Sequence, residues 1–214
     1  MITGVRIGDK DTLSEWGLIL CSDLSIGSPQ VKTKWVDIPA MDGALNMSYA
    51  LTGGEPVYKT REITFNLFGR TRKFSDVISD LMAYCHGRIH KLWLPTDSSH
   101  YYSGLFEVDK ISNYNKNMVK IKVTADPYRY KNEPTIREIV IGEDGNETVI
   151  FSNEMRKTAP LFTLISGNMT VEGHALQDKT LSFDDIVLLP GNNELHFAGT
   201  QGSKARITYQ EGKL

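Results

Sequence analysis

The feature that most constrains the fold is a series of short β-type segments in residues 132–214. Turn residues separate these segments at intervals of about ten residues, which is typical of a small β-sandwich. No helical period is visible in this part of the chain. We therefore expect an all-β sandwich here, built from the runs REIVIG, ETVIF, LFTLISG, NMTVEG, KTLSF, DIVLLPG, ELHFAG and ARITYQ.

The preceding part is also rich in strand patterns, but it contains one helical pattern. Residues 61–69 alternate between apolar and polar side chains, which predicts a half-buried strand. Residues 74–87 predict a helix with Ser75 near its N-cap and Gly87 just past its end. The apolar positions that share one face of this helix are Val77, Ile78, Leu81, Met82 and Cys85.

The sequence KIKVTADPYRYK predicts a boundary between the two parts. Residues 120–124 alternate as a strand does, and Pro127 then interrupts the pattern because proline has no N–H to donate. The charge also changes at this point. Residues 1–131 hold 17 basic and 14 acidic residues, whereas residues 132–214 hold 7 and 12. We therefore expect two domains, residues 1–131 and residues 132–214.

No membrane or secretion signal is visible in the sequence. No apolar run reaches the roughly 18 residues that a membrane-spanning helix needs, and the N-terminal residues lack the apolar core of a signal peptide. We expect synthesis in a cytoplasm and no insertion into a membrane. The two cysteines, Cys21 and Cys85, are then expected to be free thiols in preference to a disulfide.

Motifs that would indicate catalysis or a bound cofactor are weak. His86 and His90 have the H-x-x-x-H spacing of a helical zinc site, but Gly87 lies between them and no third ligand accompanies them. The adjacent Asp184 and Asp185 would point to opposite faces of a strand. No phosphate-binding loop or nucleophile elbow is present. We expect no metal, no cofactor and no enzymatic activity.

Two groups of residues suggest surfaces for contact with other molecules. Arg70, Arg72 and Lys73 form a basic cluster. It is either a solvated face or an interface that meets acidic partners or lines a passage for nucleic acid. Tyr101 and Tyr102 could serve an interface or the packing of the domain, because tyrosine combines apolar area with a polar tip. Pro39 and Asp42-Gly43 mark a tight reversal after a β-type run that contains Trp35.

The sequence resembles the distal tail protein (Dit) family of long-tailed phages and prophages of Gram-positive bacteria in the order and spacing of several segments. The matching segments are WGL near the start, WVDIPAMDGALNMS, YKTREITFNLFG, the helix, KLWLPTDSSHYYSGLFEV and VTADPYRYK. The resemblance implies a tail-tube-like N-terminal domain, a split β-barrel or sandwich with one helix. It also implies a C-terminal galectin-like β-sandwich.

The resemblance further implies a structural hub at the distal tip of a siphovirus tail. Six N-terminal domains would form a ring that joins the tail tube protein to the tail-tip protein, with receptor-binding or upper baseplate proteins at its side. DNA would pass through the ring without specific binding. The segment LTGGEPVYK would be an arm that reaches a neighbouring subunit. The expected interface residues are Gly53, Gly54, Glu55, Val57, Tyr58, Lys59, Tyr101 and Tyr102.

The alternative function is a carbohydrate-binding module that adheres to the host cell surface. A sugar platform usually needs an aromatic face, but Trp16, Trp35 and Trp93 all precede residue 132. A chain of 214 residues also leaves no room for the carbohydrate-binding insertions that some family members carry. The hub is therefore favoured over the adhesion module.

Overall fold

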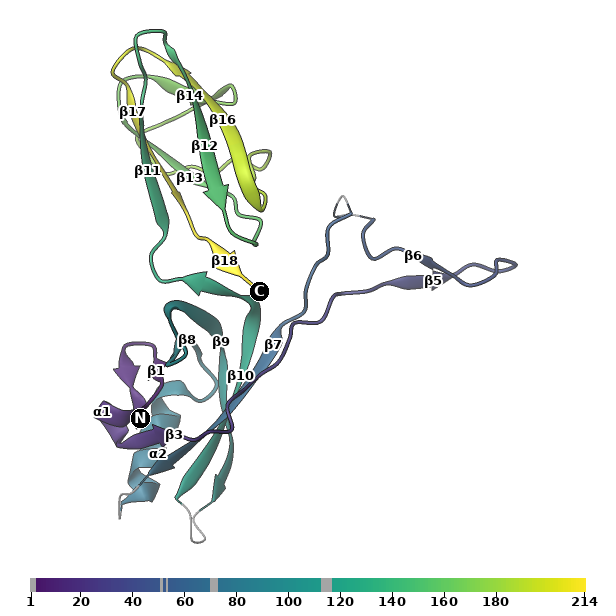
Figure 1. Cartoon of the computed structure of the whole chain (residues 1–214), viewed down its shortest axis with the longest axis vertical. Helices are drawn as coiled ribbons and strands as arrows, with labels where there is room; N and C mark the ends of the chain where they lie inside the picture. Colours follow the sequence, from purple (N-terminus) through teal and green to yellow (C-terminus); the bar gives the residue numbers. More distant parts are fainter. Residues whose placement is uncertain (1–2, 51, 53, 70–72, 113–116) are drawn as a thin grey trace. The chain divides into compact units, whose positions relative to one another are not determined.

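The structure is a computed structural model, and it describes residues 3–50, 52, 54–69, 73–112 and 117–214. The chain divides into two compact units, Met1–Pro127 and Tyr128–Leu214. Strands dominate both units, and the helices that the structure describes lie in the first (Figure 1).

The first unit is built on one large antiparallel sheet. The strand order is β2-β1-β8-β9-β10-β7-β3, and β4 pairs with β7 beside β3. The bounds are β1 Arg6–Ile7, β2 Lys10–Asp11, β3 Leu18–Leu20, β4 Ser25–Ile26, β7 Arg61–Gly69, β8 Ile89–Leu94, β9 Asp97–Ser112 and β10 Met118–Lys131.

The alternating pattern in β7 and β10 produces the centre of this sheet. Phe65 lies opposite Ile121 in the antiparallel register, and Ile63 lies opposite Val123. These four side chains are at most 1% exposed, whereas the polar residues between them face outward. The strand predicted over residues 61–69 is confirmed, because a period of two places alternate side chains on one face.

The predicted helix is α2, which spans Phe74–Cys85. Its buried side chains, Phe74, Ile78, Leu81 and Cys85, join the core of the sheet. The prediction for Ser75 was wrong. The N-cap position is Lys73, which makes no side-chain capping bond, and the helix begins at buried Phe74, so that Ser75 lies within the first turn.

A second helix, α1, spans Thr12–Trp16 and was not expected. Asp11 caps it, since its Oδ1 accepts hydrogen bonds from the backbone N–H groups of Leu13 and Ser14, both at 3.0 Å. Gly17 ends it in the left-handed region, with φ of 64°. Thr12 is buried, and its Oγ1 accepts a hydrogen bond from the backbone N–H of Val5 at 3.0 Å. Capping at both ends thus stabilises a helix that is too short to show a period.

A long extension leaves the sheet between β4 and β7 (Figure 1). It carries a hairpin of its own, in which β5 (Trp35–Asp37) pairs with β6 (Ala44–Asn46). The two limbs of the extension also pair between the hairpin and the sheet. The backbone N–H of Lys32 donates to the Val57 carbonyl, and the backbone N–H of Lys59 donates to the Gln30 carbonyl, both at 2.7 Å. We call residues 28–60 the arm; it includes the segment LTGGEPVYK, for which the sequence resemblance predicted this role.

The second unit is a sandwich of two antiparallel sheets, as expected. One sheet has the order β11-β17-β13 and the other has the order β12-β16-β14-β15. Phe151, Phe162 and Phe197 are at most 1% exposed in the core between them. The bounds are β11 Thr135–Val140, β12 Asn146–Asn153, β13 Leu161–Ser166, β14 Met169–Val171, β15 His174–Ala175, β16 Gly191–Gly199 and β17 Lys204–Tyr209.

The eight expected runs of this unit do not all form strands. KTLSF and DIVLLPG make isolated bridges instead, Leu181 with Phe162 and Leu188 with Thr158. Two short strands were missed: β15, and β18 (Gly212–Lys213). Strand β18 pairs with the last residues of β10, so that Lys213 lies opposite Arg129 and Gly212 opposite Tyr130.

Candidate interaction surface

The arm exposes many apolar side chains and buries none of those that the structure describes. Trp35 is 57% exposed although it lies in a paired strand. Several exposed apolar side chains on one segment, among them the cross-strand partners Val36 and Leu45, indicate an interaction site. The exposed apolar residues of the arm are Trp35, Val36, Ile38, Met41, Leu45, Met47, Tyr49 and Val57.

Local hydrogen bonds define the shape of the arm. Beyond the hairpin, Lys34 donates its N–H to Ser48 Oγ at 2.8 Å, and Met47 donates to the Lys34 carbonyl at 2.8 Å. Gly43 adopts φ of 75° at the tip, as the Asp-Gly pair predicts. An isolated two-stranded hairpin is only marginally stable in water. This arrangement therefore favours a partner that covers the apolar side chains.

The interface residues predicted from the sequence lie mostly on the returning limb of the arm. Gly54, Glu55, Val57 and Lys59 are exposed. Tyr58 is half-buried, where it forms a bridge with Val31. Gly53 lies outside the described residues. The side chains of the hairpin were not predicted from the sequence as contact residues. The signal for them was the group of apolar residues Trp35, Val36 and Ile38 beside a predicted turn.

Tyr101 and Tyr102 are each only 7% exposed within the chain itself. The Tyr102 ring belongs to the core, with the Arg61 guanidinium 5.4 Å from its centroid. The Tyr101 ring lies 5.4 Å from that of Trp93, and Lys91 Nζ is 4.2 Å from its centroid. Packing within the chain accounts for both tyrosines, and their role at an interface stays a prediction.

The basic cluster falls largely outside the described residues, since only Lys73 of the three is described, and it is exposed.

His86 and His90 lie in different environments. His86 Nδ1 accepts a hydrogen bond from the backbone N–H of Val108 at 2.9 Å. The His90 ring instead stacks on the Tyr84 ring, with 4.7 Å between the two ring centroids. Among the described residues no group of three or more potential ligands could hold a metal ion.

The cysteines are both free. Cys85 is completely buried in the core, and this burial raises the pKa of its thiol to about 11. Cys21 is half-buried, and its burial, followed by the nearby Asp23 carboxylate, also raises the pKa of that thiol. Neither environment provides the positive charge that activates a nucleophilic cysteine.

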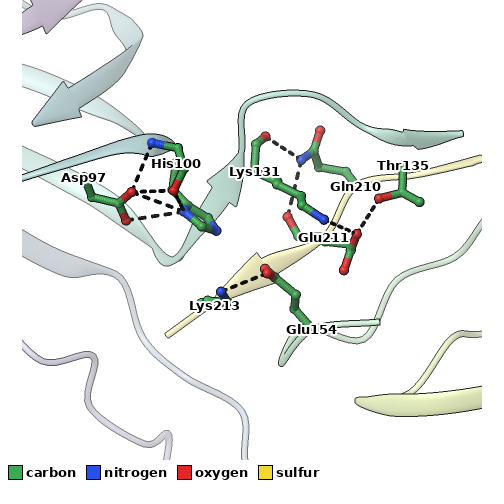
Figure 2. Close-up of polar contacts among 9 residues, drawn as sticks. Asp97, His100, Lys131, Thr135, Glu154, Gln210, Glu211 and Lys213 are labelled. Carbon is green, nitrogen blue, oxygen red and sulfur yellow. Dashed lines mark hydrogen bonds and ion pairs between the residues drawn. The ribbon is translucent and has the colours of Figure 1, made fainter. Parts of the chain in front are cut away.

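The second unit contains a partly buried polar network around Glu211 (Figure 2). The Glu211 carboxylate accepts hydrogen bonds from Lys131 Nζ at 2.7 Å and from Thr135 Oγ1. Burial would raise the pKa of Glu211, but these bonds and the lysine charge hold it below its ordinary value. Gln210 Nε2 donates to the Lys131 carbonyl at 2.8 Å, and Lys213 pairs with Glu154 at 3.0 Å. The network fixes the segment after β17 to the start of β11.

A separate polar group in the first unit contains Asp97 and His100 (Figure 2), together with Ser99. Asp97 Oδ1 accepts from the Ser99 hydroxyl at 2.7 Å and lies 3.3 Å from His100 Nδ1. Burial would raise the pKa of Asp97, but bonds from Ser99 and His100 lower it to about 2. The group tightens the turn that opens β9, which is a structural role.

None of the described helices is long and apolar enough to cross a membrane.

Comparison with solved structures gives an informative match. No protein-family model and no curated sequence matches the chain. A solved structure, that of SPP1 Dit, is similar over 100% of both chains with a TM-score of 0.69 and 12% sequence identity. SPP1 Dit is described as a paradigm of the hub adsorption apparatus in phages that infect Gram-positive bacteria. The chain therefore has the fold of a phage Dit protein over its full length, in agreement with the resemblance seen in its sequence.

Proposed function

We propose that this chain is the Dit hub of a long-tailed phage or prophage tail, located in the virion at the distal tip of the tail. The similarity to SPP1 Dit over the full length of both chains carries the proposal. The resemblance in segment order supports it independently, since it depends on sequence alone. A hub is a structural protein, and we assign it no catalytic role.

We propose that six copies form a ring through the first unit. Closed rings are built from heterologous contacts, in which one patch on each subunit meets a different patch on the next. The arm provides one such patch, because its apolar side chains are exposed in the single chain. Burial of one large apolar side chain contributes about 1.5–3 kcal/mol, so a few of these residues could hold neighbouring subunits together.

The proposed ring joins the tail tube protein on one side to the tail-tip protein on the other, and receptor-binding or upper baseplate proteins attach at its periphery. DNA would pass through the ring without specific binding. The ring-forming part of the chain, residues 1–131, holds 17 basic and 14 acidic residues, so its excess of positive charge is small. A channel wall with a strong positive charge would retain the phosphate backbone. The protein would be synthesised in the cytoplasm of the bacterial host.

The test is the assembly state of the purified full chain. We expect native mass spectrometry to show a hexamer, and negative-stain images to show rings with a central opening, either alone or after mixing with the tail tube and tail-tip proteins. A protein that remains monomeric at high concentration and in the presence of both partners would contradict the proposal.

A further inference from the structure

A hollow of about 340 Å³ lies on the second unit, over the sheet that contains β12, β16 and β14. It adjoins a second hollow of about 300 Å³, with which it shares Thr170 and Ala198. The outward positions of neighbouring strands come together here, since Thr148 lies opposite His196 and Thr170 lies opposite Ala198. The residues that line it include Asn146, Glu147, Thr148, Thr170, Glu172, His196 and Ala198.

The polar groups of this hollow are held in place by the protein. Thr148 Oγ1 lies 3.0 Å from His196 Nδ1, which fixes the imidazole on the outer face of the sheet. Glu172 Oε1 accepts the backbone N–H of His196 at 2.7 Å, and Glu172 donates its own N–H to the His196 carbonyl at 3.0 Å. Within the described residues, His196 Nε2 and Glu172 Oε2 have no protein partner.

The position of Glu172 requires an unusual backbone conformation. Val171 pairs with His174, so Glu172 and Gly173 form a two-residue turn with φ of 46° and 85°. Two positive φ values define a type I′ turn, which favours asparagine, aspartate or glycine. A glutamate here is strained, and its bond to His196 offsets part of that strain. The fold thus holds a carboxylate at the rim of the hollow against the local preference of the backbone.

We propose that this hollow binds a neutral saccharide. An imidazole, a carboxylate, hydroxyls and the Asn146 amide provide both donors and acceptors, which suits a ligand with several hydroxyl groups. The Ala198 methyl and the Thr170 side chain supply an apolar surface for the C–H face of a sugar ring.

The same features exclude other ligands. Glu147 and Glu172 line the hollow and repel phosphate-rich polymers. The face over β16 offers no free backbone edge to an extended peptide, because β16 is paired with β12 and β14 on both sides. The second unit offers no tryptophan as a stacking platform, so we expect a weak site with a Kd of the order of 1 mM.

The test uses the full chain and saturation-transfer difference NMR with methyl glycosides of glucose and N-acetylglucosamine. Polyglycerol phosphate serves as the anionic comparison. We expect signals from a neutral glycoside that saturate in the millimolar range. His196→Ala should weaken binding at least tenfold. Glu172→Gly should do the same while preserving the fold, because glycine accepts a positive φ. Ser152→Ala, an exposed change on β12 in the same sheet but outside the hollow, is the control and should bind as the wild type does.

Three results would overturn the proposal: no signal from either glycoside at tens of millimolar, a signal that both variants retain, or binding of polyglycerol phosphate alone. None of them bears on the proposed hub. The saccharide site depends only on the second unit, whereas ring formation is measured separately by mass on the same samples.

Discussion

Glu211 and Lys131 form an ion pair at 2.7 Å that joins the segment after β17 to the last residue of β10. The carboxylate side chain is 8% exposed and the lysine side chain is 43% exposed. Because the bonds it accepts lower the pKa of Glu211, its ionised form is stabilised by folding. The pair therefore contributes stability above the pKa of the unfolded carboxyl, and this stability is lost as the pH falls through the lower pKa of the folded state.

We expect Glu211→Gln to lower the free energy of unfolding near neutral pH by about 1.5–3 kcal/mol, the usual value for a hydrogen bond to a charged group. The difference between wild type and variant should narrow as the pH falls below the ordinary carboxyl value of 4.5. Denaturant unfolding followed by circular dichroism between pH 3 and pH 7 measures this. Glu138→Gln, which breaks an exposed pair with Arg206, is the control, and it should change little.

The second prediction concerns the start of the second unit. Strand β18 pairs with Arg129 and Tyr130, and Lys131 meets Glu211. A fragment of residues 132–214 contains both sheets of the sandwich and should fold as an all-β unit, but it lacks these three residues. A fragment of residues 128–214 should be more stable by about 1–3 kcal/mol. Thermal melts followed by circular dichroism compare the two. Equal stability would show that the β10–β18 pairing adds nothing.

The third prediction concerns the thiols. A raised pKa leaves little thiolate, and burial blocks access to the sulfur. At pH 8 and without denaturant, we expect Ellman's reagent to label Cys21 slowly and Cys85 not at all over the same period. In denaturant both should react at once. Cys21→Ala should abolish the slow native phase, and a native phase that survives this change would place Cys85 in a more open environment than the core.

The sequence predicts the parts of the fold that repeat a local pattern. The alternation in β7 and the apolar face of α2 are visible without any tertiary information. Helix α1 is not, because five residues are too few to show a period and its stability comes from capping at Asp11 and Gly17. The capping role predicted for Ser75 is wrong for a different reason. Helix α2 begins one residue earlier, at Phe74, whose side chain is buried in the core, and burial cannot be read from the local sequence.

The candidate sites show the same division. The hairpin tip follows from the Asp42-Gly43 turn, and the exposure of Trp35 does not, because burial depends on what the rest of the chain leaves uncovered. The hollow on the second unit depends on the register of three strands, which brings Thr148, His196 and Glu172 together from distant positions. No local pattern contains that information.

The last prediction tests the arm as the contact between subunits. Trp35 and Ile38 belong to no core cluster, so Trp35→Ser with Ile38→Ser should leave the melting temperature of the dissociated chain within about 2 °C of the wild type. The same double variant should weaken the proposed ring strongly, because each lost apolar contact is worth about 1.5–3 kcal/mol at every interface. Sedimentation velocity over a range of concentrations should show the hexamer replaced by smaller species. Ile136→Ser, an exposed change in the second unit, is the matched control and should leave assembly intact. Deletion of residues 52–57 removes part of the returning limb and should also weaken the ring. If the hexamer survives both the deletion and the double variant unweakened, the arm does not hold the subunits together, and the contact lies elsewhere on the first unit.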